Sequence, residues 1–369
     1  MKDPGQETAS GPLPVLSFFT GGGFLDIGFE KAGFRTAWTN EFNPLIADLH
    51  DHAYTQWRRS LNPAAPEAKI SNRKSIRAIS TGEILDEAFG GRRPPVFGVV
   101  GGPPCTDFSK GGANAGGTGS AGRLTGIYVQ RLLALKPSFF VLENVPGLAR
   151  HPSHLAYFRR KKALLAHDYH IHEQIVSALE LGVPQDRDRL FLVGIRKELD
   201  GANRPFAWPH DERYSGAKLL PWPREAKKGE AVEKPAQIPD ALTVNAAFGN
   251  GGGVEHLSNG REWFQPYSRK FREVPEGRVA TKSFKRLHRY RYSPTAWYGN
   301  QEVHLHPTEA RRISVREALR LQSVPDTYAL PENATLCAKF RLICNGVPVQ
   351  LAERVAESVR SHLRTLRVT

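Results

Sequence analysis

One cysteine, Cys105, stands in a sequence context that suits nucleophilic chemistry. It follows an apolar run, 96–100, and the four residues Gly-Gly-Pro-Pro, so the sequence predicts a buried strand that ends in a stiff loop just before the thiol. Ligands and chemistry collect at the carboxyl ends of strands in open α/β sheets. A thiol at such a strand end acts as a nucleophile when its thiolate is stabilised. The alternative is a free cysteine that serves as a small buried hydrophobic residue.

Polar side chains are also predicted at a second strand end and along one face of a further strand. Glu143 directly follows the apolar run 138–142, and burial there would raise its pKa and suit a general acid. Gln185, Arg187 and Arg189 are spaced by two, which places all three on one face of a strand. Arginines in such a row suit a phosphate or a pyrimidine carbonyl. The alternatives are a carboxylate that caps a turn and an edge strand that carries surface charge.

A glycine-rich turn near the N-terminus is typical of a nucleotide-cofactor site. Residues 14–19 predict a strand, Gly21–Gly23 a turn, and the following residues up to Gly33 a helix. Glycines let a ligand approach the backbone, and a helix N-terminus offers free N–H groups. Glu41 follows a second predicted strand, where an acidic side chain would accept from the hydroxyls of a ribose. A turn without a ligand and a solvated loop carboxylate are the alternatives.

Composition favours a polyanionic partner and a reducing compartment. The 369 residues carry 51 Lys and Arg against 37 Asp and Glu, a formal charge of +14 with a pI near 9.8. The only cysteines are Cys105, Cys337 and Cys344, which make neither a disulfide framework nor a zinc site. No stretch approaches 18 apolar residues, and residues 1–12 lack the apolar core of a signal peptide. We therefore expect a cytoplasmic, nucleoid-associated protein with no membrane partner.

The first half of the chain contains three segments of less regular composition. Residues 57–74 are rich in Pro, Ala and charge and predict a surface insertion. Six glycines in 110–122 predict either a lid that closes on substrate or a flexible linker, and 127–135 predict a helix. The five histidines of 151–172 match no metal-ligand spacing, so this segment is interpreted as a solvated basic helix.

The second half predicts an irregular domain followed by a return to helices. Residues 197–305 show no sustained periodicity, and within them 261–291 hold ten Lys and Arg against three Glu, interleaved with aromatics. Such a composition suits a nucleic-acid face. Ser314 and Glu317 form a capping box that opens a helix, and Pro348 precedes a long amphipathic helix expected to pack on the first domain.

Taken in order, these segments resemble the cytosine-C5 DNA methyltransferases of bacteria and phages. The resemblance covers roughly 14–196 and 307–363 and leaves 200–300 without a recognisable match. The blocks similar to that family are SFFTGGGFLDIGFEKAG, NEF, GGPPCTDFS, LENV, PQDRDRLFLVGIR, RRISVREALRLQSVPD and ICNGVPVQLAERVA. Several ordered blocks are far more specific than any one of them.

The resemblance implies a Rossmann-like α/β methyltransferase domain with a smaller, irregular target recognition domain. It predicts a disordered lead-in (1–12), a catalytic and cofactor-binding domain (13–199), a target recognition domain (200–335) and a C-terminal segment that returns to the catalytic domain (336–369). The implied cofactor is S-adenosylmethionine, with S-adenosylhomocysteine as product and no metal. The implied partner is double-stranded DNA, with a cognate restriction nuclease or phage-defence proteins as further partners of a monomer.

The resemblance also implies roles for individual residues. The thiolate of Cys105 would add to C6 of a flipped-out cytosine while Glu143 protonates N3, and the methyl group would go to C5. The expected catalytic residues are Cys105, Glu143, Arg187 and Arg189. The expected cofactor-binding residues are Phe19, Gly21, Gly23, Glu41, Asn345 and Val347. The expected DNA-binding residues are Pro104, Ser109, Gln185, Arg269, Arg272 and Arg286.

Four positions depart from the family pattern. Ser17 stands where an Asp usually opens the cofactor loop, Phe24 replaces a glycine, Ser75 an adenine-binding Asp, and Thr106 a Gln. These departures bear on cofactor affinity. The alternative functions are a tRNA cytosine-C5 methyltransferase, a catalytically inactive DNA-binding relative, and an unrelated cysteine hydrolase, for which no histidine is placed to pair with Cys105.

Overall fold

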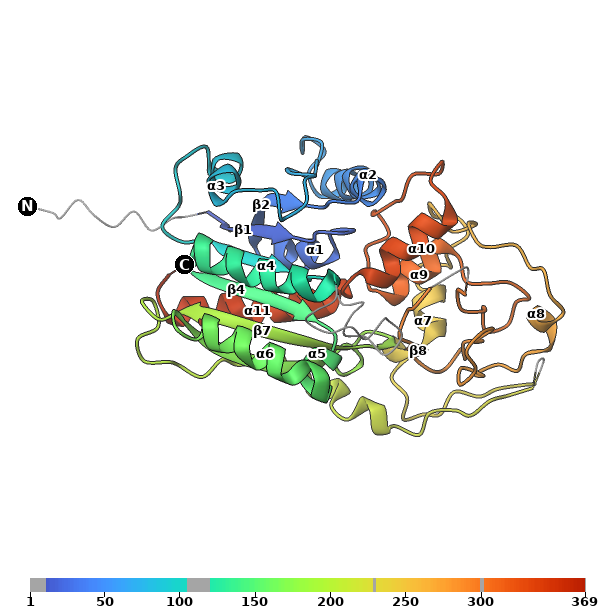
Figure 1. The fold of residues 1–369 in the computed structure, drawn as a ribbon. Coiled ribbons are helices and arrows are strands. Elements are labelled where there is room, and N and C mark those ends of the chain that lie inside the picture. Colours follow the sequence, from blue (N-terminus) through green and yellow to red (C-terminus); the bar gives the residue numbers. More distant parts are fainter. Residues whose placement is uncertain (1–10, 105–119, 228–229, 299–301, 369) are drawn as a thin grey trace, which may run out of the picture.

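A six-stranded sheet forms the centre of the first half of the chain (Figure 1). The computed structural model describes residues 11–104, 120–227, 230–298 and 302–368. Its strands are β1 (Leu13–Phe18), β2 (Phe34–Asn40), β3 (Gly98–Gly101), β4 (Phe139–Asn144), β5 (Tyr169–Ser177) and β7 (Asp188–Arg196), in the order β2-β1-β3-β4-β7-β5. Strands β1 to β4 are parallel, and β7 runs antiparallel to both of its neighbours. The predicted Rossmann-like α/β fold is confirmed.

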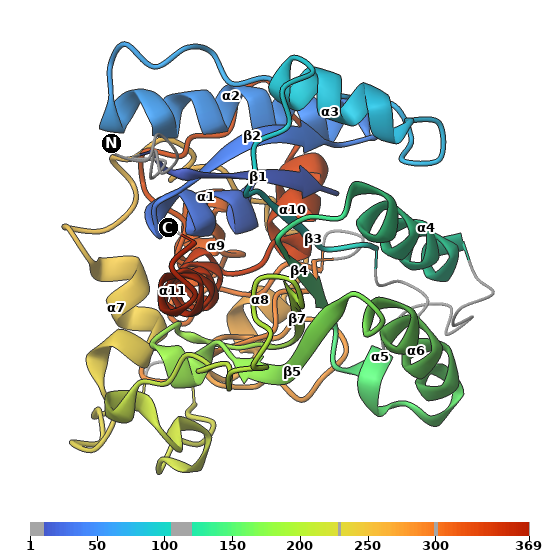
Figure 2. The same cartoon turned by 90° about the vertical axis from the view of Figure 1, so that its left-hand side faces the viewer.

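Helices cover both faces of this sheet (Figure 2). On one face, α1 (Phe24–Lys31) and α11 (Val349–Thr365) pack together and bury Val15, Val141 and Val193 of the strands. On the other face, α3 (Thr81–Phe89), α4 (Ser120–Leu135) and α6 (Pro152–Leu165) cover the alternate strand residues, such as Leu16 and Leu142. Strands buried on both faces read as continuous apolar runs, which is why they were predictable.

Two segments differ from their predictions. Residues 57–61 complete α2 (Pro44–Leu61), and Trp57 is buried, so 57–74 is not simply a surface insertion. Asn72, farther along this segment, is also buried, and its carbonyl accepts a hydrogen bond from Asn40 Nδ2 at 2.8 Å. Segment 151–172 is not one basic helix, since α6 ends at Leu165 and the edge strand β5 begins at Tyr169. The charged residues of the first segment made its buried positions hard to recognise in the sequence. In the second segment, the polar residues of an edge strand made β5 resemble a solvated helix.

The irregular region lies beyond the carboxyl ends of the strands, on the right of Figure 1. Its regular elements are short: α7 (Val244–Gly249), α8 (Lys270–Glu273), and β8 (Ser293–Pro294), which pairs with β6 (Gln185–Asp186). Helices α9 (Val315–Leu321) and α10 (Leu336–Asn345) join it to α2 through one hydrophobic cluster that includes Phe24 and Tyr54. A short α5 (Gly147–Arg150) follows β4. The predicted boundaries at 199/200 and 335/336 remain predictions.

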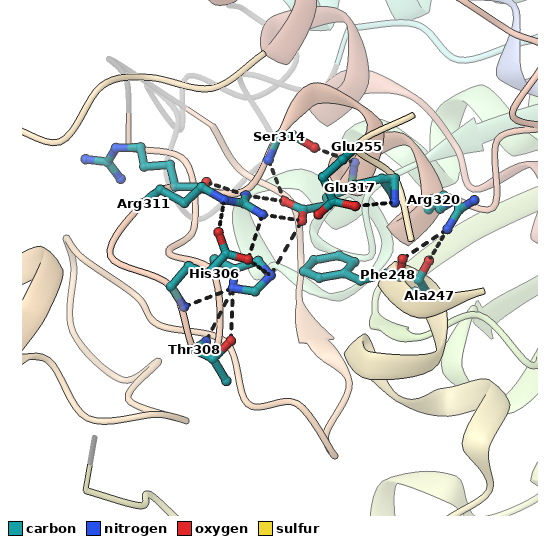
Figure 3. Close-up of polar contacts among 12 residues, drawn as sticks. Ala247, Phe248, Glu255, His306, Thr308, Arg311, Ser314, Glu317 and Arg320 are labelled. Carbon is teal, nitrogen blue, oxygen red and sulfur yellow. Dashed lines mark hydrogen bonds and ion pairs between the residues drawn. The ribbon is translucent and has the colours of Figure 1, made fainter. Parts of the chain in front are cut away.

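A buried ionic cluster fastens the irregular region to α9 (Figure 3). Ser314 and Glu317 form the predicted capping box, which is confirmed. Both oxygens of Glu317 also accept from Arg311, each at 2.8 Å, and His306 Nε2 lies 3.5 Å from the same carboxylate. Arg320, from the next turn of α9, donates to the carbonyls of residues 247, 248 and 250. The helix thereby holds two stretches of the irregular region that are 60 residues apart in sequence.

Among the residues that the structure describes, no helix combines the length and the apolar content that crossing a bilayer requires.

Candidate active site

Nine of the predicted site residues line one cavity at the carboxyl ends of β1 to β4. Its volume is about 580 Å³, within the usual range for small-molecule sites. The predicted residues that line it are Phe19, Gly21, Glu41, Pro104, Glu143, Arg187, Arg189, Asn345 and Val347. These come from segments up to 328 positions apart in sequence, so the fold, rather than any local motif, assembles the cavity. Gly23 and Gln185 do not line it.

The turn after β1 is held by Glu41 at the end of β2. The Gly21 N–H donates to Glu41 Oε2 at 3.1 Å, and the Asn43 N–H donates to Oε1 at 2.8 Å. Gly21 and Gly23 adopt positive φ angles of 56° and 76°, which glycine tolerates best. Each carboxylate oxygen keeps a second lone pair for a hydroxyl group. Beside it Phe42 projects into solvent with 67% of its surface exposed and also lines the cavity.

Glycines allow protein side chains to pack closely against the backbone in the cavity wall. A Cβ on Gly22 would lie 2.6 Å from Leu342 Cδ2, so a larger residue there would displace the Leu342 side chain. Tyr328 donates its hydroxyl to the Gly22 carbonyl at 2.7 Å and packs its ring edge-on against Phe24. A Cβ on Gly346 would lie 2.2 Å from the Phe24 ring, so the Phe24 departure is matched by a glycine across the cavity. The close backbone and the carboxylate at the strand end fit a nucleoside cofactor.

Glu143 and Arg189 form an ion pair inside this cavity. Arg189 Nε lies 3.0 Å from Glu143 Oε1, and both side chains are nearly buried, with 11% and 12% exposed. Burial raises the pKa of Glu143 above its ordinary value, although the charges of Arg189 and Arg187 pull it down. Gly102 permits this position, because a Cβ there would lie 2.7 Å from Glu143 Oε2. The result is a desolvated carboxyl group beside a fixed cation.

Arg187 is fully buried and joins three parts of the chain. Its Nη1 donates to the Ala296 carbonyl at 3.2 Å, and its Nη2 to the carbonyls of Cys344 and Gly346 at 2.8 Å each. These contacts tie the sheet to the irregular region and to the turn between α10 and α11. Arg187 therefore fixes the cavity wall, whereas Arg189 is the arginine that meets Glu143.

The loop after β3 is only partly described. Cys105 and Ser109, predicted as nucleophile and DNA contact, lie outside the described residues, as does the Thr106 departure. The loop's first residues are anchored, because Asn144 Nδ2 donates to the Pro103 carbonyl at 3.2 Å. Pro104 lines the cavity.

Two residues predicted to contact DNA are buried instead. Gln185 is fully buried and donates to the Leu321 carbonyl at 3.2 Å. Arg286, with 1% of its surface exposed, donates to the carbonyls of residues 271, 274, 306 and 309. These contacts give both residues a structural role, and their predicted contacts with DNA remain predictions. Composition cannot separate such arginines from exposed ones. Arg269 and Arg272, by contrast, are exposed at and beside α8, far from the sheet in Figure 1.

Sequence reasoning missed Asp26 and Phe42. Asp26 is completely buried in α1, and Phe42 follows Glu41 at the cavity mouth. A charged residue inside the apolar string Phe-Leu-Asp-Ile-Gly-Phe was the available signal for the first. The described residues contain no group of three or more His, Cys, Asp or Glu side chains that could hold a metal ion.

Comparison with known proteins decides the family. The model of the C-5 cytosine-specific DNA methylase family matches residues 13–361. The chain belongs to this family. It is thus a cytosine-C5 DNA methyltransferase, as predicted, and the family and fold imply use of S-adenosylmethionine.

Several curated relatives of this methylase are type II methyltransferases. M.NmeDI of Neisseria meningitidis serogroup C is 40% identical over 358 residues, covering 95% of this chain and 84% of the relative. M.FnuDI of Fusobacterium nucleatum is 28% identical over 363 residues, covering 95% of both.

Solved structures agree on the fold. A prophage protein of E. coli described as a DNA modification methyltransferase matches with a TM-score of 0.63 and 23% identity, over 95% of this chain and 99% of its own. The Dnmt2 methyltransferase of S. pombe matches with a TM-score of 0.60 and 14% identity, over 96% and 99%. At these identities the likeness concerns the fold of the methylase and not its substrate.

Proposed function

We propose that this protein methylates C5 of one cytosine in a short duplex DNA sequence, as the modification enzyme of a restriction-modification or phage-defence system. The observation that carries this proposal is the buried Glu143–Arg189 pair, which shares its cavity with the Gly21 turn and the Glu41 carboxylate that accepts from it. A desolvated carboxyl group can protonate a pyrimidine ring, and the glycine turn with Glu41 can bind a nucleoside cofactor. The cavity therefore has groups for both the cytosine and the methyl donor.

The cofactor half of the cavity fits S-adenosylmethionine. Glu41 would accept from the ribose hydroxyls, the backbone of Phe19 and Gly21 would line the methionine part, and Asn345 and Val347 would close the far wall. The exposed ring of Phe42 offers a face on which adenine stacks. When bound, the cofactor supplies an electrophilic methyl group. Ser75 lines the same cavity and presents a hydroxyl where a carboxylate was expected.

The protein's own groups prepare the cytosine. The Cys105 thiolate forms a bond to C6, and the electron pair of the C5–C6 double bond moves into the ring, where a proton from Glu143 at N3 neutralises it. A raised pKa keeps part of the Glu143 population protonated for this donation. Arg189 holds the carboxyl group in position. After methylation, a water molecule takes the C5 proton, the C5–C6 double bond re-forms as the Cys105 thiolate leaves C6, and the N3 proton returns to the Glu143 carboxylate.

The DNA must be opened for this chemistry. A cytosine inside the double helix cannot present C6 to a thiolate, so the base is flipped into the cavity. Residues 200–335 act as the recognition domain, 13–199 as the catalytic domain, 336–369 as the returning segment and 1–12 as the lead-in. Arg269 and Arg272 are exposed cations placed to meet phosphates, while Pro104 and Ser109 act at the loop beside the flipped base. One monomer in the cytoplasm, bound to DNA, suffices for one flipped base.

The test is transfer of labelled methyl groups from S-adenosylmethionine to unmethylated genomic DNA and, in parallel, to bulk tRNA. The expected result is label in DNA only, and bisulfite sequencing then places it at one short motif. Label confined to tRNA would contradict the proposal.

Two variants and one control assign the chemistry. Cys105→Ser and Glu143→Gln should abolish or greatly reduce transfer while cofactor binding persists. Cys337→Ser is the matched control, because Cys337 is an exposed free cysteine outside the cavity. Loss of activity in Cys337→Ser, or full activity in Cys105→Ser, would refute the assignment.

A further inference from the structure

Asp26 is a buried carboxyl group that meets no cation or N–H donor among the residues the structure describes. It lies in the first turn of α1, directly after the cofactor turn, and none of its surface is exposed. Among the described residues, neither of its oxygens meets a hydrogen-bond partner of ordinary geometry. Buried carboxylates are normally paired with cations or N–H donors, because an unpaired buried charge is costly. A carboxylate kept in this state calls for an explanation.

The surrounding charges do not neutralise Asp26. Arg58 of α2, whose charge acts on Asp26, is held by Glu30, with Nη2 2.6 Å from Oε1 and Nε 3.2 Å from Oε2. Glu30 also repels Asp26, while the Ser17 hydroxyl of β1 and Arg58 partly offset the effect. Burial is the largest influence and raises the pKa of Asp26 to about 7. The two phenols that face it, Tyr54 and Tyr328, are buried and stay neutral, because burial raises their pKa values.

Ser17 connects Asp26 to the cavity. Ser17 lines the cavity, whereas Asp26 stands behind it. The Ser17 oxygen accepts a hydrogen bond from Thr20 Oγ1 at 3.1 Å, which fixes the hydroxyl within the cofactor turn. A charge placed behind one buried layer still acts strongly, because little water screens it. Asp26 is therefore sited to influence a charged ligand without touching it.

The cofactor and its product differ in charge. S-adenosylmethionine carries a positive sulfonium group, and S-adenosylhomocysteine carries a neutral thioether in its place. We propose that Asp26 is a positioning residue for the cofactor: its carboxylate, acting through Ser17, favours the cationic S-adenosylmethionine over the neutral product. This inference rests on the proposed cofactor site. It gives the unpaired carboxylate a partner that is present only when the cofactor is bound, and it aids product release.

The proposal predicts a proton linkage that a merely structural carboxylate would not show. Binding of S-adenosylmethionine favours the ionised form of Asp26, so the protein releases about half a proton at pH 7 on binding, while S-adenosylhomocysteine causes less release. Between pH 6 and pH 8 the ionised fraction rises about tenfold, so the preference for the cofactor over the product should rise by up to about tenfold.

Isothermal titration calorimetry of the full chain tests these predictions. Each ligand is titrated at pH 6, 7 and 8 in two buffers of different ionisation enthalpy, which reports protons released. Asp26→Asn should remove both the extra proton release and the rise in preference with pH. The control Asp48→Asn removes the same charge at the surface, where Asp48 pairs with Arg73, and should behave as the wild type.

A double variant keeps the charge but moves it. Asp26→Ser combined with Ser17→Asp exchanges the facing carboxylate and hydroxyl and should restore the preference at pH 8. Equal proton release for both ligands in the wild type would overturn the inference, and this result needs no variant to fold. Unchanged preference in Asp26→Asn would overturn it as well. If the wild type binds neither ligand, the proposed cofactor site itself fails, which is a distinguishable result.

Discussion

Replacing Asp26 by Asn should change how the stability of the protein depends on pH. The pKa of Asp26 rises from an ordinary 3.8 to about 7 in the fold. The native state therefore keeps a proton up to about pH 7 that the unfolded chain loses near pH 4. The free energy of unfolding falls as pH rises through this window. Asn cannot ionise, so Asp26→Asn lacks this decline.

The size of the effect follows from the shift. Roughly three pKa units correspond to about 4 kcal/mol, and about half of this is lost between pH 5.5 and pH 8. Asp26→Asn should therefore gain about 2 kcal/mol relative to the wild type over that interval. This gain holds whatever fixed cost the buried amide adds, because the comparison is between two pH values.

Urea-induced unfolding, followed by tryptophan fluorescence at pH 5.5 and pH 8, measures the difference. Asp48→Asn serves again as the surface control and should follow the wild type. If the wild type and Asp26→Asn change in parallel between the two pH values, Asp26 is ionised throughout and the reasoning from its burial is refuted.

Three further predictions concern other parts of the molecule. Glu317→Gln should lower the free energy of unfolding by about 2 kcal/mol, since it weakens two charge-assisted hydrogen bonds of the buried Arg311, which keeps its ion pair with the more exposed Glu309; an unchanged urea midpoint would contradict this. Gly102→Ala should displace the Glu143 carboxyl group and lower the rate of methyl transfer by roughly 100-fold, with cofactor affinity unchanged by calorimetry. Arg269→Ala with Arg272→Ala should weaken DNA binding and reduce the slope of log affinity against log salt by about 2, without loss of stability. Arg286→Ala should lower the free energy of unfolding and leave the salt slope of DNA binding unchanged, because it leaves buried carbonyl groups without their donor. An equal change of salt slope in Arg286→Ala and in the Arg269→Ala, Arg272→Ala double variant would contradict the separation of buried from DNA-binding arginines.

The parts of the site that follow strands were predictable from the sequence. Buried parallel strands are apolar, so a polar residue at the end of such a run is easily recognised: Glu41 directly follows β2, and Glu143 is the next-to-last residue of β4. Their meeting in one cavity follows from parallel pairing at a shared edge. The family match then confirmed the overall assignment without testing the role of any single residue.

The parts that depend on long-range burial were not predictable. Arg286 and Arg269 look alike in a basic stretch, but one lies among four main-chain carbonyls and the other in solvent. Of the other arginines there, Arg289 pairs with Glu276 and Arg278 with Glu225. The cationic surface available to DNA is therefore smaller than the composition indicates. The local sequence pattern predicts which face of an element a residue occupies. It does not predict the hydrogen-bond partners of that residue, because they belong to segments distant in the sequence that only the fold brings close.

The arginine row connects the candidate catalytic carboxyl group to the irregular region. Arg187 and Arg189 are two residues apart, yet Arg189 meets Glu143 and Arg187 holds the Ala296 carbonyl of the irregular region. The same segment is fixed again where β6 pairs with β8. Arg187 thus connects the irregular region to Glu143, because its charge helps to lower the pKa of that carboxyl group. In the proposed mechanism, the carboxyl group that protonates the base is therefore coupled through Arg187 to the region proposed to recognise the DNA sequence.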